Sequence, residues 1–179
     1  MWKNTTEKYG IISKSIHWLT AIVFFCMFAL GFWMVDLTYY SEWYQTAPHW
    51  HESIGVLLFA LTIARVLWRQ LSNQPSAIAT HSSRIQLFSK IGHMSIYILL
   101  ITLMVSGYLI SSADERAISV FNWFELFSLG ELFENQEDIA GAIHEYIAYI
   151  LVVLTLLHGI AALKHHFIDK DQTLTRMLK

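Results

Sequence analysis

Apolar residues in this 179-residue chain gather into four long blocks, and shorter polar stretches separate them. Read as helices, the blocks run over about residues 16–35, 53–71, 91–111 and 139–163. Each block is close to the roughly 20 residues that a helix needs to cross a bilayer. None carries the polar stripe typical of a helix in a soluble bundle. The pattern therefore predicts an all-α integral membrane four-helix bundle, with residues 1–179 as a single membrane domain.

The composition agrees with a membrane protein. Hydrophobic residues make up 55% of the chain and charged residues only 15%, well below the charged share of soluble domains. The N-terminus lacks the small-residue cleavage pattern of a signal peptide, so we expect the first block to remain as the first span. Cys26 is the single cysteine, which excludes an internal disulfide, and no C-x-x-C-H motif is present for covalent haem attachment.

The positive charges mark one side of the predicted bundle. All but one of the 12 lysines and arginines lie in the N-terminal arm, around the connection between the second and third spans, or in the C-terminal tail; the exception is Arg116. With four spans these regions share one side, and the positive-inside rule places that side, with both termini, in the cytoplasm. The opposite side holds an acidic and aromatic segment of about residues 112–138. We expect this segment to lie on the outer membrane surface as short helices.

Four histidines stand near the ends of the apolar blocks, where imidazole is unusual unless it serves a metal, a proton path or a ligand. His144 and His158 are fourteen residues apart, so on one helix they project from the same face, about 21 Å apart along the axis. The predicted topology places His158 at the depth of His17, and His144 at the depth of His51. Because only residues at one depth can share a metal, we predict two pairs, His17 with His158 and His51 with His144.

A pair of imidazoles suits haem better than zinc. A zinc site usually has three or four protein ligands, whereas each predicted pair supplies two. Two imidazoles on haem iron leave no open position, which favours electron transfer over oxygen chemistry. Small residues on the same helical faces leave room for a macrocycle, although they equally permit close helix packing. Arg65 either neutralises a haem propionate or extends its side chain to the cytoplasmic interface.

The remaining histidines are less constrained by position. His93, at the inner start of the third span, is predicted to line a pocket near the inner haem or to act as a substitute ligand. His165 and His166 follow the fourth span, where they either face lipid headgroups or carry protons at a quinone, since imidazole titrates near neutral pH. His49 is an outer-surface alternative to His51, and His81 is predicted to be an ordinary loop residue.

Several segments resemble the bacterial cytochrome b-561 family of di-haem inner-membrane proteins, and together they cover nearly the whole chain. They are Ser15–Leu19 (SIHWL), His51–Gly55 (HESIG), Arg65–Arg69 (RVLWR), Gly92–Gly107, Ile143–Glu145 (IHE), Leu157–Gly159 (LHG) and His165–Leu174 (HHFIDKDQTL). The resemblance implies haem ligation by His17, His51, His144 and His158, in agreement with the depth argument. Within the family the chain is most similar to a branch associated with a periplasmic isoprenoid-binding protein, which implies a periplasmic lipid-binding or redox partner.

The leading functional hypothesis is a multi-pass inner-membrane protein whose two haem b groups move single electrons between a periplasmic-side partner and the quinone pool. His165 and His93 would border the quinone site, with ubiquinone as the expected substrate of a quinone-linked oxidoreductase. One alternative is a superoxide:ubiquinone oxidoreductase, which the acidic outer side disfavours because it repels an anion. Others are a passive haem-bearing subunit and a haem-free metal or lipid transporter. A homodimer stays open, and no nucleic-acid partner is expected.

Overall fold

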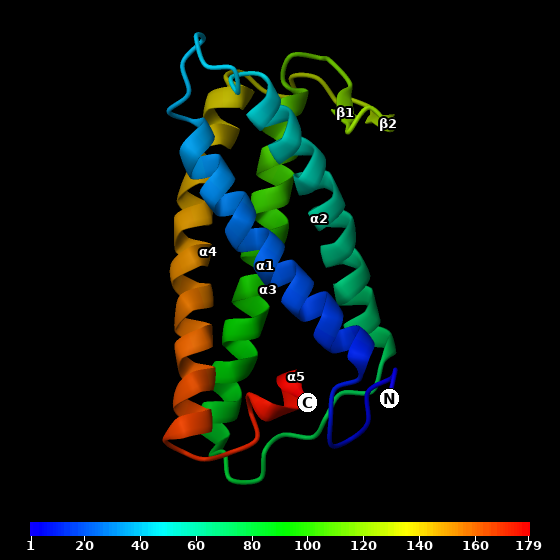
Figure 1. Cartoon of the computed structure of the whole chain (residues 1–179), viewed down its shortest axis with the longest axis vertical. Helices are drawn as coiled ribbons and strands as arrows, with labels where there is room; N and C mark the ends of the chain where they lie inside the picture. The colour runs from blue at the N-terminus through cyan, green and yellow to red at the C-terminus, as the bar shows by residue number, and fades with distance from the viewer.

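The computed structural model describes residues 1–179 and contains four long helices. α1 spans Ile11–Met34, α2 Thr46–Leu71, α3 Ser83–Ser112 and α4 Gln136–Phe167. All four are long and apolar enough to cross a membrane, which confirms the predicted all-α four-helix architecture. The helices run alternately up and down, and the N- and C-termini lie at the same end (Figure 1). We call this the terminal end, and the opposite end, which carries a short β-hairpin, the hairpin end.

Each helix is longer than the apolar block that predicted it. α3 begins at Ser83, well before the predicted start near residue 91, and the Ser82 side chain caps it by accepting a hydrogen bond from the Ile85 amide at 3.5 Å. α4 begins at Gln136, whose side chain is fully buried and donates to the Leu109 carbonyl at 2.9 Å. Helix ends are set by such caps and local hydrogen bonds, whereas hydropathy detects only the apolar centre of a span.

The outer segment does not form the short helices that we expected. Its centre is an antiparallel hairpin of β1 (Ile118–Val120) and β2 (Phe124–Leu126). Phe121 and Asn122 at the turn have φ angles of 49° and 59°, the left-handed conformation that tight hairpin turns require. The β-branched and aromatic residues on either side favour strands. Ser53 of α2 anchors the turn, because its Oγ accepts a hydrogen bond from the Phe121 amide at 3.0 Å.

The buried apolar core is small. Phe24 of α1, Leu100 and Leu103 of α3, and Leu151 of α4 form one cluster, and Leu58 of α2 is also buried. Most other large apolar side chains point outward, as suits helices whose surroundings are lipid rather than water. The buried apolar residues therefore lie near the middle of the bundle, and the histidines of α1–α4 lie toward its two ends.

Both chain ends are held against the terminal end of the bundle. The short helix α5 (Thr175–Leu178) lies near the start of α1 (Figure 1), and the indole Nε1 of Trp18 donates a hydrogen bond to the Met177 carbonyl at 3.0 Å. In the N-terminal arm, Asn4 is buried. Its Oδ1 accepts from the Gly10 amide at 2.8 Å and its Nδ2 donates to the Asn73 carbonyl at 2.9 Å.

Candidate haem sites

The structure brings four histidines together in two pairs, one at each end of the bundle. At the terminal end, His17 of α1 and His158 of α4 have ring centroids 6.4 Å apart. At the hairpin end, His51 of α2 and His144 of α4 have ring centroids 6.2 Å apart. The planes of the two rings cross at 69° in the first pair and 70° in the second. These are the same pairs that follow from matching the histidines by depth.

The separation within each pair suits two imidazoles that share a metal ion. An imidazole nitrogen binds a first-row transition metal at about 2.0–2.1 Å, and the ring centre lies about 1.1 Å farther back. Two rings on opposite sides of one ion therefore have centres about 6.3 Å apart. The separations of 6.2 and 6.4 Å agree with that value.

The hydrogen bonds at the hairpin end are also compatible with metal ligation. His144 Nδ1 lies 2.9 Å from the Leu103 carbonyl oxygen. Because a carbonyl only accepts, Nδ1 carries the proton and Nε2 is the nitrogen with a free lone pair. A carbonyl bond of this kind orients metal-ligating histidines. His51 Nδ1 is buried without a hydrogen-bond partner, which is costly for a polar atom unless a further group satisfies it.

Glycines back both rings at the hairpin end. A Cβ added to Gly31 of α1 would lie 3.1 Å from His51 Cε1, and one added to Gly107 of α3 would lie 3.1 Å from His144 Cε1. Both contacts are shorter than the 3.5–4.0 Å at which carbon atoms pack best, so any larger residue would press on a ring. We define the hairpin-end site as these four residues, one from each helix: Gly31, His51, Gly107 and His144.

The terminal-end site likewise takes one residue from each helix, namely His17, Arg65, His93 and His158. The Arg65 guanidinium turns toward His17, with Nη2 2.7 Å from His17 Nδ1, and lies over the Tyr97 ring at 5.3 Å. Arginine only donates, so in this arrangement His17 Nδ1 accepts and the ring proton is on Nε2. The structure therefore places the Arg65 side chain beside His17, and its pairing with a haem propionate stays a prediction.

His93 lies closer to His158 than His17 does. The ring centroids of His93 and His158 are 5.1 Å apart, which is too short for two rings on opposite sides of one ion by the spacing given above. His93 Nδ1 is 2.7 Å from the Ser89 carbonyl oxygen, so this nitrogen donates and Nε2 is able to accept a proton. The geometry therefore favours His17 and His158 as the metal-sized pair, with His93 next to it.

An interval of fourteen residues connects the two sites along every helix. The connected residues are His17 and Gly31, His51 and Arg65, His93 and Gly107, and His144 and His158. Fourteen residues make nearly four turns, so each helix presents one residue to each site from one face. Four buried apolar residues stand midway, namely Phe24, Leu58, Leu100 and Leu151. Gly31 and Gly107 were not among the predicted site residues, although the same interval of fourteen residues, counted from His17 on α1 and from His93 on α3, leads to them.

His165 packs away from the terminal-end site. It lies seven residues, about two turns, beyond His158, and its ring centroid is 4.7 Å from that of His81. His81 is not the ordinary loop residue that we expected, since its Nε2 lies 2.6 Å from Asp171 Oδ2. Burial alone would raise the pKa of the Asp171 carboxyl, but hydrogen bonds from Thr173 and His81 lower it to about 2.

The two remaining histidines lie outside both sites. His166 packs against Phe167, and His49 lies in the first turn of α2.

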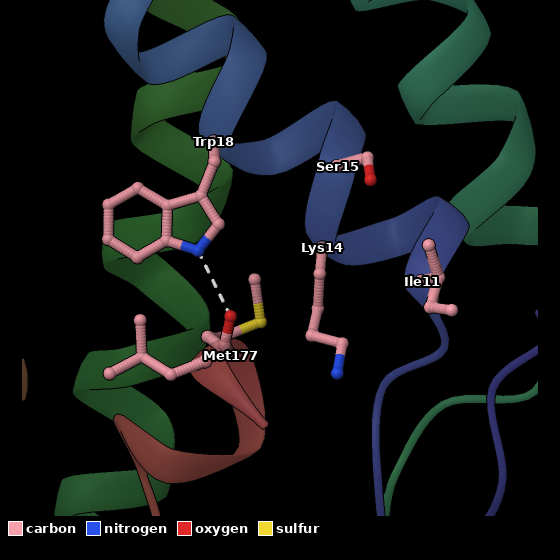
Figure 2. A pocket seen from close by; sticks show the side chains of 6 residues that line it. Ile11, Lys14, Ser15, Trp18 and Met177 are labelled. Atoms are coloured by element: carbon pink, nitrogen blue, oxygen red, sulfur yellow. Dashed lines mark hydrogen bonds between the residues drawn. The ribbon is translucent and has the colours of Figure 1, made fainter. Parts of the chain in front are cut away.

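A cleft opens at the terminal end beside the first turns of α1. Its volume is about 550 Å³, and it is lined by Ile11, Lys14, Ser15, Trp18, Met177 and Leu178. Figure 2 shows the Trp18 indole bonded to the Met177 carbonyl across this cleft, with the Lys14 side chain beside them. The cleft combines mostly apolar walls with one cation, and Trp18 directly follows His17 in the chain. The cleft therefore adjoins the segment of α1 that carries His17.

Comparison with known proteins identifies relatives over the whole bundle. The sequence profile of the family described as prokaryotic cytochrome b561 matches residues 8–179. The Escherichia coli K12 protein named "Cytochrome b561 homolog 2" is 50% identical over 175 residues, which cover 98% of this chain and 93% of that protein.

More distant relatives also match along nearly their full length. The Yersinia pestis protein named "Probable superoxide oxidase CybB" is 27% identical, with 96% of each chain covered. The E. coli K12 protein named "Cytochrome b561 homolog 1" is 25% identical, with 91% of this chain and 92% of that protein covered. The family match, the four membrane-length helices and the two pairs of facing imidazoles agree with one another, and the chain belongs to the prokaryotic cytochrome b561 family of haem b-binding membrane proteins of electron transfer.

Proposed function

We propose that this protein carries single electrons across the bacterial inner membrane through two haem b groups and exchanges them with quinone. The observation that carries the proposal is the presence of two imidazole pairs, at opposite ends of one bundle, each at the spacing of ligands to a shared ion. His17 and His158 would hold one haem, and His51 and His144 the other. Haem iron with two imidazole ligands supplies one-electron chemistry and has no open position for oxygen.

The residues around the pairs fit a haem. Gly31 and Gly107 keep the helix surfaces flat behind the rings of His51 and His144. Arg65 supplies a positive charge inside the bundle, where a haem carboxylate would be a partner of opposite charge. For His17 to bind a metal through Nε2, the ring proton has to be on Nδ1. His17 Nδ1 then no longer accepts a hydrogen bond from Arg65, so the guanidinium needs another partner, such as the haem carboxylate.

We propose that the terminal end faces the cytoplasm. The N-terminal arm, the connection between α2 and α3, and the C-terminal tail all lie at that end (Figure 1), and 11 of the 12 lysines and arginines lie in these segments or in the helix ends next to them. The positive-inside rule places such segments in the cytoplasm. The hairpin end would then face the periplasm, which is the side on which we expect an electron-exchanging or lipid-binding partner.

We place quinone exchange at the terminal end. The cleft of about 550 Å³ has the apolar walls that an isoprenoid quinone requires, and it adjoins α1 next to His17. Quinone reduction takes up protons as well as electrons. His93 is our candidate for a proton-handling residue, because its Nε2 is able to accept a proton while Nδ1 stays bonded to Ser89. For His165, which we also expected at the quinone, the contacts with His81 and Asp171 favour a different role.

Haem content and single substitutions test the proposal. Purified protein should contain two haem b groups per chain with a reducible low-spin spectrum. His51→Ala and His17→Ala should each leave one haem, at opposite ends, while His49→Ala, two residues from His51, should leave both. Membrane-inserted protein without haem, or an unchanged haem content in His51→Ala and His17→Ala, would contradict the assignment.

Reoxidation by a soluble ubiquinone tests the quinone step. The chemically reduced protein should be reoxidised anaerobically, and Trp18→Ala, which removes one wall of the cleft, should slow this reaction without changing haem content. His93→Gln should slow it more at high pH than at low pH, because the glutamine amide cannot deliver a proton. Equal rates in the two variants and the unsubstituted protein would remove the cleft and His93 from the quinone site.

A further inference from the structure

Three polar residues from distant parts of the sequence meet at the terminal end, outside both histidine pairs. His81 comes from the connection between α2 and α3, His165 from the last turn of α4, and Asp171 from the chain that follows. Their side chains are mostly buried, with exposed fractions of 13%, 16% and 6%. One ligand atom from each residue lies within 4.8 Å of the other two.

Protein hydrogen bonds do not fully explain this cluster. His81 Nε2 is bonded to Asp171 Oδ2 at 2.6 Å. His165 Nδ1 lies at ion-pair distances of 2.7 Å from Asp169 Oδ2 and 3.4 Å from Asp171 Oδ2, but neither contact has the angles of a hydrogen bond. Asp169 instead accepts hydrogen bonds from the Lys164 ammonium at 2.6 and 2.9 Å. His165 Nδ1 therefore lies beside two carboxylates without a hydrogen bond that would fix its position.

The types and spacing of the atoms suit a transition-metal ion. Imidazole and carboxylate are ligands for Zn²⁺ and related divalent ions, which bind them at about 2.0–2.2 Å. Two ligand atoms of a tetrahedral ion are then about 3.3 Å apart. His165 Nδ1 and Asp171 Oδ2 already have this separation, at 3.4 Å. His81 Nε2 would have to move about 0.7 Å from Asp171, within reach of a side chain on a loop.

We propose that His81, His165 and Asp171 form a binding site for a divalent transition-metal ion. Zn²⁺ is the ion used in the experiments below. Water would complete the coordination, while Asp169 remains paired with Lys164. The site is separate from the haem ligands and does not depend on the proposed electron transfer. The bound ion would join the α2–α3 connection to the end of α4 and to the chain leading into α5.

This position gives the ion an effect on the cleft. α5 contributes Met177 and Leu178 to the wall of the cleft, and Arg176 Nη1 donates to the Ser76 carbonyl at 2.7 Å. An ion at His81, His165 and Asp171 would therefore add a second link between the α2–α3 connection and the C-terminal segment. The expected result is a more firmly positioned α5.

Zinc binding to the haem-loaded protein tests the proposal, because the haem groups keep the other histidine pairs occupied. After a chelator wash, equilibrium dialysis with Zn²⁺ and metal analysis should find one tight equivalent per chain. Loss of a metal-orienting residue typically weakens binding about 10- to 100-fold, so His81→Ala and Asp171→Asn should each weaken it by at least about tenfold. The control His49→Ala should bind like the unsubstituted protein. Zinc binding that is the same in all four proteins would overturn the proposal.

A second measurement needs no substitution and covers variants that fail to fold. Diethyl pyrocarbonate modifies free imidazole nitrogens, and peptide mass spectrometry locates the modified residues. With Zn²⁺ at about ten times its Kd, only about a tenth of the sites stay free, so modification of both His81 and His165 should slow about tenfold while the rate at His49 stays unchanged. If Zn²⁺ leaves the rates at His81 and His165 unchanged, the cluster is a hydrogen-bonded contact and not a metal site.

Discussion

Replacing Gly31 by alanine is expected to release the haem proposed for the hairpin-end site. The added Cβ would stand 3.1 Å from Cε1 and 3.6 Å from Nδ1 of His51. Carbon atoms pack best about 3.5–4.0 Å apart, so the ring has to retreat by about 0.4–0.9 Å unless α1 moves away. A metal–imidazole bond of about 2.0–2.1 Å does not tolerate a displacement of this size.

The magnitude follows from the cost of overpacking. Inserting a methyl group into a well-packed interior costs about 1–3 kcal/mol, and about 1.4 kcal/mol corresponds to a tenfold change in an equilibrium constant. We therefore expect the affinity of this site for haem to fall about 5- to 150-fold. Alanine is about 1 kcal/mol better than glycine inside a helix. The variant should consequently lose haem while its helices remain intact, which separates the effect from unfolding.

The assay is haem retention in detergent with apomyoglobin present to capture released haem. Gly31→Ala should lose one of its two haem groups much faster than the unsubstituted protein. Gly141→Ala is the matched control, because its Cβ would meet nothing within 4 Å. Gly107→Ala should behave like Gly31→Ala, since its Cβ would lie 3.2 Å from His144 Nδ1. If Gly31→Ala and Gly141→Ala retain haem equally well, the reasoning is refuted.

Three further substitutions test other contacts. Gln136→Leu removes the partner of the Leu132 amide and should lower the free energy of unfolding in denaturant by about 1–3 kcal/mol; an unchanged value would mean that water replaces the amide. Arg65→Gln removes a cation beside His17 and should lower the midpoint potential of one haem only in a redox titration, because a nearby positive charge favours the reduced iron. Asn4→Asp cannot donate to the Asn73 carbonyl and should speed tryptic cleavage of the N-terminal arm, whereas Asn73→Asp keeps that carbonyl and should not.

The number of helices and the pairing of the histidines could be predicted from the sequence. A backbone in lipid has to satisfy its hydrogen bonds within itself, so apolar blocks of membrane length have to be helices. The fixed rise per residue then converts residue number into depth. This is why His17 could be matched with His158 and His51 with His144 before any contact was known.

The backbone conformation of the outer segment was harder to predict. We expected short helices there because the segment mixes acids with aromatic residues and is too apolar for a disordered linker. Instead, the left-handed φ angles of Phe121 and Asn122 make a tight turn. The hairpin also depends on Ser53 of α2, a partner more than sixty residues away that no local pattern reveals.

The sequence by itself therefore determined the helices, their order across the membrane and the depth of each histidine, because these depend on hydropathy and helix rise. Only the tertiary structure decided how close the paired rings come to each other, that Gly31 and Gly107 lie behind them, and that His81 meets His165 and Asp171. These contacts depend on the lateral arrangement of the helices and the path of the connections. Side-chain packing between distant segments sets both, and no periodicity along a single helix encodes it.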